Sequence, residues 1–227
     1  MLIIQEREKS SLSVQNNGFV PPKYLGWLVD EAQKSLVTIS CKSSLGSGFS
    51  FYLDEFDREA GFQHFDSSIE GATSVLITNE HVIRDCVDSS TVRITIADET
   101  SHEAKIERVD VANDLALLTT SVKIKPISGA SWKPTPAYWA MALGSPHNFR
   151  GSVTIGTVIN LDASKVFHTA SLSPGNSGGP LLDNGGYLYG VNSGSKPVGQ
   201  NFNISVGVNA FCDLLIKCTK SRYWADK

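Results

Sequence analysis

A serine held in a glycine-rich turn is the residue of this sequence best placed to do chemistry. Ser177 lies within residues 173–180, Ser-Pro-Gly-Asn-Ser-Gly-Gly-Pro, directly before an apolar run. A serine that attacks a carbonyl needs backbone N–H groups aimed at the developing oxyanion, and a tight turn can aim the amides of Gly175 and Ser177 at one point. We therefore expect an oxyanion hole within Gly175, Asn176 and Ser177. A Ser-Gly-Gly on its own would be an ordinary turn.

A histidine and an aspartate upstream could activate this serine, whose hydroxyl is a weak nucleophile without a base. Residues 75–80 have the pattern of a strand that leads directly into His81. Asp114 begins the apolar run 114–118, where a partly buried carboxylate needs a partner and could hold the histidine ring. Taken alone, His81 would be a surface or core histidine and Asp114 a turn aspartate.

The order of the three residues along the chain strengthens the functional interpretation. His81, Asp114 and Ser177 follow one another in that order, each at the edge of an expected strand. Among serine hydrolases this is the chymotrypsin order, and not that of subtilisin or of the α/β-hydrolases. We predict that Ser177 is the nucleophile, His81 the general base and Asp114 the residue that orients His81.

The elements that must position these residues are short strands. The pattern of six and six short strands predicts an all-β fold of two barrels or sandwiches, with a short helix at each end. Of these two architectures we expect two six-stranded antiparallel β-barrels. Residues 1–23 form a polar arm and 24–227 the domain, which begins with a helix over 24–34. The first barrel spans about 36–120, the second about 137–208, and a closing helix about 209–220. A long polar insertion, 54–72, interrupts the first barrel.

Composition and charge restrict the classes of partner. The 20 basic and 23 acidic residues give a formal charge of -3 without a basic block, so we expect no nucleic-acid partner. We expect no membrane partner either, since no segment has the length and apolarity of a membrane span. Residues 1–9 become polar too soon for a signal peptide, which predicts a cytoplasmic location unless a leader was removed.

The cysteines give a weaker signal. Four of them, Cys41, Cys86, Cys212 and Cys218, are too few and too scattered to define a disulfide framework in a domain of this size. Free, mostly buried thiols are the preferred interpretation, and a Cys41–Cys86 bridge stays open if the chain is exported. The cysteine and histidine spacings match no common zinc pattern, so we expect neither a metal nor another cofactor.

Several motifs together resemble the trypsin-like serine proteases, and within them the HtrA/Deg group. They are Gly46-Ser47-Gly48-Phe49, Ile77-Thr78-Asn79-Glu80-His81-Val82-Ile83, Asp114-Leu115-Ala116-Leu117-Leu118, Ala142-Leu143-Gly144-Ser145-Pro146 and the segment Pro174 to Pro180. The last motif is highly specific, whereas the Gly-Ser-Gly strand is not. The resemblance covers most of residues 35–211 and is to an HtrA/Deg protease domain without a PDZ domain. It does not indicate an oligomeric state.

The resemblance also implies where a substrate side chain would bind. It places Ser171, Leu172 and Ser173 on one wall of the specificity pocket, and Asn192, Ser193, Gly194 and Ser195 on the other. None of these is charged, so we expect cleavage after small or medium aliphatic residues of unfolded protein, and not after Lys or Arg. Because His168 lies close in sequence, cleavage after Glu stays open as a minor alternative. Two alternatives remain: a protease-fold module that holds peptides without turnover, and an interaction protein that uses the arm and the insertion.

Overall fold

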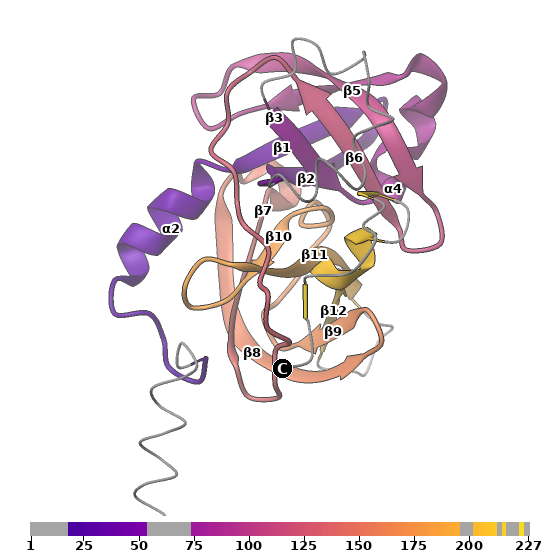
Figure 1. The fold of residues 1–227 in the computed structure, drawn as a ribbon. Helices are drawn as coiled ribbons and strands as arrows, with labels where there is room; N and C mark the ends of the chain where they lie inside the picture. The colour runs from indigo at the N-terminus through magenta and orange to yellow at the C-terminus, as the bar shows by residue number, and fades with distance from the viewer. Residues whose placement is uncertain (1–17, 54–73, 196–201, 213–214, 217–222, 225–227) are drawn as a thin grey trace, which may run out of the picture.

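Two β-barrels, one above the other in Figure 1, form the body of the molecule. The computed structural model describes residues 18–53, 74–195, 202–212, 215–216 and 223–224. Each barrel is closed by six antiparallel strands, as the sequence predicted. The strand orders are β1-β2-β3-β6-β5-β4 and β10-β11-β12-β9-β8-β7. The first barrel contains β1 (Leu36–Cys41), β2 (Ser44–Ser50), β3 (Ser74–Thr78), β4 (Thr91–Thr95), β5 (Ser101–Asp110) and β6 (Leu115–Thr120). The second contains β7 (Trp139–Gly144), β8 (Ser152–Asp162), β9 (Lys165–His168), β10 (Pro180–Leu182), β11 (Leu188–Ser195) and β12 (Asn203–Gly207).

The strand β6 shows how the barrels are joined. All six of its residues are buried, and alternate side chains point to opposite faces of a strand. Ala116 and Leu118 fill the interior of the first barrel, whereas Leu115 and Leu117 belong to the larger core that extends into the second barrel. One strand therefore serves two cores, and its first residue lies at the seam between them.

The helix α2 (Leu25–Gln33) precedes the first barrel, as predicted, but only part of its apolar sequence is buried. Leu28 and Ala32 pack on the larger core, while Tyr24 and Trp27 are 67% and 64% exposed. Residues 18–20, which we assigned to the arm, contact the second barrel: the rings of Phe19 and Tyr138 lie 4.7 Å apart, and the Asn184 amide donates to the Val20 carbonyl. Residues 1–17 and the predicted insertion lie outside the described residues.

The closing helix predicted over about 209–220 is described only in part, and its start is a 3-10 helix. A 3-10 helix, η4, occupies Val208–Cys212, and a turn follows at residues 215–216. Most of the remaining predicted range lies outside the described residues. A short 3-10 helix, η3 (Pro146–Asn148), links β7 to β8.

The preference for free thiols was wrong for two of the cysteines. Cys41 and Cys86 form a disulfide that bridges the end of β1 to η2 (Arg84–Ser89), the 3-10 helix that follows α4 (Glu80–Ile83). Their Cα atoms lie 5.8 Å apart although 45 positions separate them in sequence. Only the folded barrel creates this proximity, so sequence spacing could not reveal it.

A buried carboxylate organises the turn between β10 and β11. Asp183 is 1% exposed, and its Oδ1 atom accepts the N–H groups of Gly185 and Tyr187, both at 2.8 Å. Burial raises the pKa of Asp183 to about 6 from its ordinary value of 3.8, more than these hydrogen bonds lower it. The turn therefore depends on a carboxyl group whose burial disfavours its ionised form.

Removal of the disulfide tests its contribution to stability. The bridge closes a loop of 45 positions, which predicts that the variant with both Cys41→Ala and Cys86→Ala loses about 3–4 kcal/mol of unfolding free energy. Urea denaturation measures this loss. Wild-type protein treated with reductant should lose a similar amount, and a double variant as stable as the oxidised wild type would contradict the prediction.

The buried carboxylate predicts a pH-dependent difference in stability. Because the folded state holds the proton of Asp183 more tightly than the unfolded chain does, stability falls as the pH rises from about 4 towards 7. Asp183→Asn keeps Oδ1 as an acceptor but cannot ionise. Relative to this variant, the wild type should lose about 2 kcal/mol over that range, as measured by urea denaturation. A difference that does not change with pH would exclude the raised pKa.

Candidate active site

Asp114 stands at the seam between the barrels because it immediately precedes β6. It adopts a left-handed conformation, with φ of 54°, in the tight turn that connects β5 to β6. Aspartate is one of the few residues that tolerate this conformation. The side-chain amide of Asn79 donates to the Asp114 carbonyl at 2.8 Å and fixes the turn from the neighbouring strand end.

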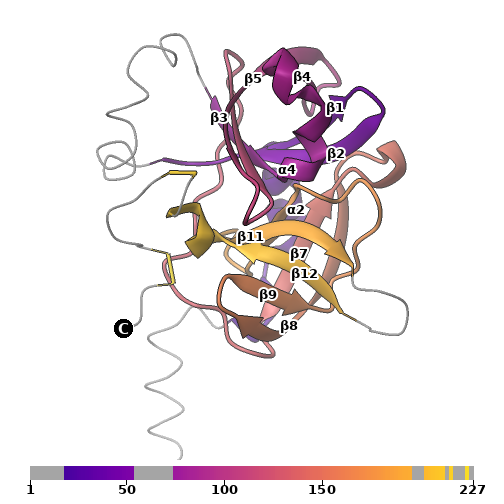
Figure 2. The same cartoon turned by 90° about the vertical axis from the view of Figure 1, so that its right-hand side faces the viewer.

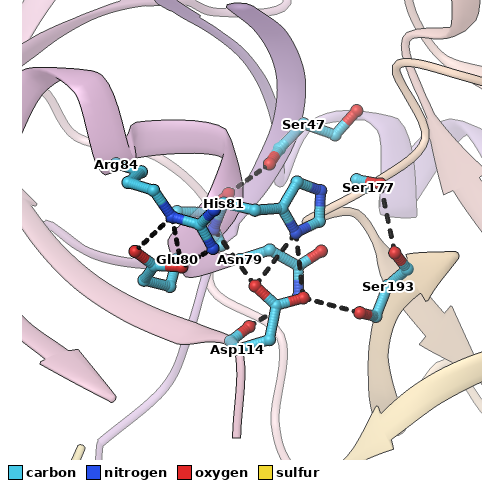
Figure 3. Close-up of polar contacts among 9 residues, drawn as sticks. Ser47, Asn79, Glu80, His81, Arg84, Asp114, Ser177 and Ser193 are labelled. Atoms are coloured by element: carbon cyan, nitrogen blue, oxygen red, sulfur yellow. Dashed lines mark hydrogen bonds and ion pairs between the residues drawn. The ribbon is translucent and has the colours of Figure 1, made fainter. Parts of the chain in front are cut away.

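His81 is held on Asp114 through both its backbone and its ring. It lies in α4, the single helical turn that follows β3, and its backbone N–H donates to Asp114 Oδ1 at 3.1 Å. The ring Nδ1 lies 2.9 Å from each carboxylate oxygen. Figure 3 shows the ring above the carboxylate, with its other edge turned towards Ser177. The Nε2 atom is therefore the one available to exchange a proton with a nucleophile.

A fourth residue, Ser193, completes the surroundings of the carboxylate. Its hydroxyl donates to Asp114 Oδ2 at 2.7 Å. The pairing between β11 and β12 shifts register between Asn192 and Gly194, so Ser193 is the extra residue of a β-bulge. A bulge redirects the side chain that it carries. We had assigned Ser193 to the wall of the specificity pocket, but its hydroxyl faces the carboxylate instead.

These contacts keep the carboxylate ionised. Burial alone would raise the pKa of Asp114, but the hydrogen bonds from His81, Ser193 and the His81 backbone together lower it below 3.8. The negative charge is thus in place at neutral pH, where it can stabilise a protonated imidazole. The adjacent Glu80 carboxylate, 6% exposed, pairs with Arg84 at 2.6 Å instead of competing for the histidine.

The turn before Ser177 leaves two backbone N–H groups without an acceptor in the described structure. The Asn176 N–H donates to the Ser173 carbonyl at 2.9 Å, and Gly175 has a φ of 101°. A proline followed by a residue with φ near about +80° is the signature of a type II turn. In the described structure the N–H groups of Gly175 and Ser177 donate to no acceptor. The Asn176 N–H is taken up by the turn itself, so including Asn176 in the oxyanion hole was wrong as far as its amide is concerned.

Ser177 is brought to the same seam, but its hydroxyl is not bonded to the histidine. Its Oγ donates to the Ser193 carbonyl at 3.4 Å, and no hydrogen bond to His81 occurs in the described structure (Figure 3). Ser193 therefore contacts the carboxylate with its side chain and the serine with its backbone. The structure brings all three predicted residues together, with Ser193 as the link that sequence reasoning missed.

The residues assigned to the specificity pocket fall into two groups. Ser171 and Ser173 are exposed, and Leu172 is half-buried against the larger core. Asn192 is fully buried, and its amide donates to the carbonyls of Leu143 and Pro180, so the assignment of its side chain to the wall was wrong.

The side of Gly194 that would carry a Cβ atom faces open space, because such an atom would meet nothing within 4 Å. Ser195 ends β11, where it pairs with Asn203. Within the described ranges, no three histidine, cysteine or carboxylate side chains gather closely enough to hold a metal ion. Nor does the described part of the chain contain a helix with the length and apolarity to cross a membrane.

Comparison with known proteins agrees with this geometry. The family described as trypsin-like peptidase domain matches residues 61–191. The chain belongs to this family. The barrels also match solved trypsin-like peptidases in fold: a serine endoprotease from Yersinia pestis, with a TM-score of 0.70 and 24% identity, covers 88% of this chain and 67% of its own. The HtrA-type protease AlgW with tripeptide gives a TM-score of 0.66 and 22% identity over 83% of this chain and 61% of its own.

The curated relatives of this trypsin-like chain confirm the predicted HtrA/Deg resemblance. Protease Do-like 1, chloroplastic, of Arabidopsis thaliana is 33% identical over 64% of this chain and 37% of its own length. A probable periplasmic serine endoprotease DegP-like from Marinomonas sp. is 34% identical over 67% of this chain and 30% of its own. The putative serine protease HhoB of Synechocystis is 29% identical over 59% of this chain and 35% of its own length. The matched region spans about a third of the length of these relatives.

Proposed function

We propose that this chain is a serine endopeptidase that hydrolyses peptide bonds through an acyl-enzyme. The observation that carries the proposal is the placement of His81 Nδ1 at 2.9 Å from both Asp114 oxygens, beside a serine whose turn leaves two N–H groups without an acceptor. An ionised carboxylate that is already hydrogen-bonded holds the imidazole in one tautomer and favours its protonated form. Those are the properties a general base needs at neutral pH.

Acylation begins when the Ser177 side chain turns from the Ser193 carbonyl towards His81. The Ser177 proton passes to His81 Nε2 as Oγ bonds to the substrate carbonyl carbon, and the carbonyl oxygen gains negative charge. The N–H groups of Gly175 and Ser177 would stabilise that oxyanion. The tetrahedral intermediate then collapses: its C–N bond breaks, and His81 gives its proton to the departing amine.

Deacylation repeats the sequence with water. His81 takes a proton from a water molecule as its oxygen bonds to the acyl carbon, and the ester bond to Ser177 breaks when His81 returns the proton to Oγ. The cycle ends with free enzyme and a new carboxyl terminus. None of these steps requires a cofactor.

The substrate should bind as an extended strand. Gly194 and Ser195 pair with β12 on one side, and no other strand pairs with these two residues in the described structure. The space around Gly194 leaves room for a substrate backbone there. Strand addition requires locally unfolded polypeptide, which makes unfolded protein the substrate class. Leu172 would narrow the pocket, so we propose cleavage after small or medium aliphatic residues.

The disulfide is an indication of the cellular compartment in which the chain resides. Disulfides persist in oxidising environments and are rare in the cytosol. The Cys41–Cys86 bridge therefore favours an oxidising compartment over the cytoplasmic location expected from the N-terminal residues. The names of two relatives include chloroplastic and periplasmic, but they describe those proteins.

Labelling with a fluorophosphonate probe tests the proposed chemistry. The probe forms a bond only with an activated serine, so wild type should be labelled and Ser177→Ala should not. Ser121→Ala, which removes an exposed serine outside the nucleophile turn and the proposed pocket, is the matched control and should label like wild type. A folded wild type without labelling would favour a peptide-binding module without turnover.

A peptide library tests the specificity. With the residue that supplies the scissile carbonyl varied, cleavage should be fastest after Val, Ala or Ile, with graded preferences of ~1–3 kcal/mol per methylene. Leu172→Gly should shift the preference towards larger side chains. Dominant cleavage after Lys, Arg or Glu would refute the proposed pocket, as would the same profile in Leu172→Gly.

A further inference from the structure

Ser47 connects the first barrel to the turn that carries the nucleophile. It lies in β2, between two glycines, and none of its surface is exposed. Its backbone N–H donates to the Ser177 carbonyl at 2.8 Å, and its hydroxyl donates to the Gly175 carbonyl at 2.7 Å. A single residue of the first barrel thus binds both residues whose N–H groups would stabilise the oxyanion.

The hydrogen bonds of the Ser47 hydroxyl can have only one direction. The Gly175 carbonyl can only accept, and the N–H of Ser145, 2.9 Å from Ser47 Oγ, can only donate. The hydroxyl proton therefore points at Gly175. Ser145 follows β7 of the second barrel. The Ser47 hydroxyl therefore also links the nucleophile turn to another segment of the second barrel.

Ser47 is also bound to the segment that carries the general base. The Thr78 hydroxyl donates to the Ser47 carbonyl at 2.6 Å, and Thr78 ends β3, three positions before His81. Gly178 also approaches the Ser47 carbonyl closely, because a Cβ atom on Gly178 would lie 2.0 Å from the Ser47 carbonyl oxygen. The four hydrogen bonds of Ser47 thus run from the histidine segment to the nucleophile turn.

We propose that Ser47 is a positioning residue for catalysis, which holds the carbonyl of Gly175 so that the N–H groups of Gly175 and Ser177 converge on the oxyanion. The inference rests on the proposed function. Without the hydroxyl, the Gly175 carbonyl loses its partner, and the peptide unit between Gly175 and Asn176 is held only by the hydrogen bond from its N–H to the Ser173 carbonyl. The hole would then form only in a fraction of the molecules, which lowers the rate of the chemical step more than the binding of substrate.

The experiment compares Ser47→Ala with Ser50→Ala. Ser50 is a matched control because it lies in the same strand, is 1% exposed and donates its hydroxyl to the Ile124 carbonyl at 3.3 Å, away from the turn. With the peptide that the library selects, Ser47→Ala should lower kcat about 10- to 100-fold and leave KM within about 2-fold. Ser50→Ala should change neither by more than about 2-fold.

Two inhibitors separate the oxyanion hole from general binding. The aldehyde of the selected peptide forms a hemiacetal with Ser177: Oγ adds to the carbonyl carbon, the Ser177 proton passes to His81, and the hemiacetal oxygen accepts the two N–H groups. The corresponding alcohol binds without forming this bond. Ser47→Ala should weaken inhibition by the aldehyde about as much as it lowers kcat, and should leave inhibition by the alcohol within about 2-fold.

Each result supports or overturns the inference. An unchanged kcat in Ser47→Ala, an equal loss in Ser50→Ala, or equal weakening of both inhibitors would overturn the role of Ser47 while the proposed function stands. If Ser47→Ala does not fold, Ser47→Cys replaces it, since a thiol is only a weak donor and acceptor, and the same loss is expected. A folded wild type that neither reacts with fluorophosphonate nor cleaves any peptide would overturn the proposed function, and the inference with it.

Discussion

The two barrels have to meet in one fixed arrangement, because each supplies half of the site. His81 and Asp114 belong to the first barrel, and Ser177 to the second. A displacement of about 1 Å between such groups is enough to lower a reaction rate by about two orders of magnitude. Figure 2 shows the two barrels stacked on each other. The apolar face of β6 joins them through the larger core, and the hydrogen bonds of Ser47 set the fine position. The burial of apolar side chains holds the two barrels together, and the polar contacts fix their relative position.

Electrostatics at the seam follow from the same arrangement. A carboxylate between two barrels loses much of its hydration and stays ionised only if donors replace the lost water. Asp114 has three such donors: the ring of His81, its backbone N–H and the hydroxyl of Ser193. Two come from the first barrel and one from the second. Correct docking of the barrels therefore also completes the environment of the charge, so that structure and ionisation depend on each other.

The sequence predicted those features that depend on local pattern. The six-strand barrels follow from short alternating runs, and the three candidate catalytic residues from motifs of a few neighbouring positions. The role of Ser193 could not be predicted, because a bulge is defined by register against β12 and not by the strand itself. The buried orientation of Asn192 and the Cys41–Cys86 bridge likewise arise from segments that are distant in the chain and adjacent only in the folded barrels. The role of Ser47 could not be predicted either, because its Gly-Ser-Gly motif is not specific and its hydrogen-bond partners lie far away in the sequence.

The disulfide has a consequence for a chain that can meet proteases, itself included. It joins residues on either side of the sequence 54–73, so a cut anywhere within that stretch yields two fragments that remain covalently linked. The amino-terminal fragment would carry β1 and β2, the strand that holds Ser47, and the carboxyl-terminal fragment all three candidate catalytic residues. A nicked molecule would run as one species on a non-reducing gel and as two after reduction. Clipping at this point would therefore leave the strand with Ser47 attached to the part of the chain that performs the chemistry.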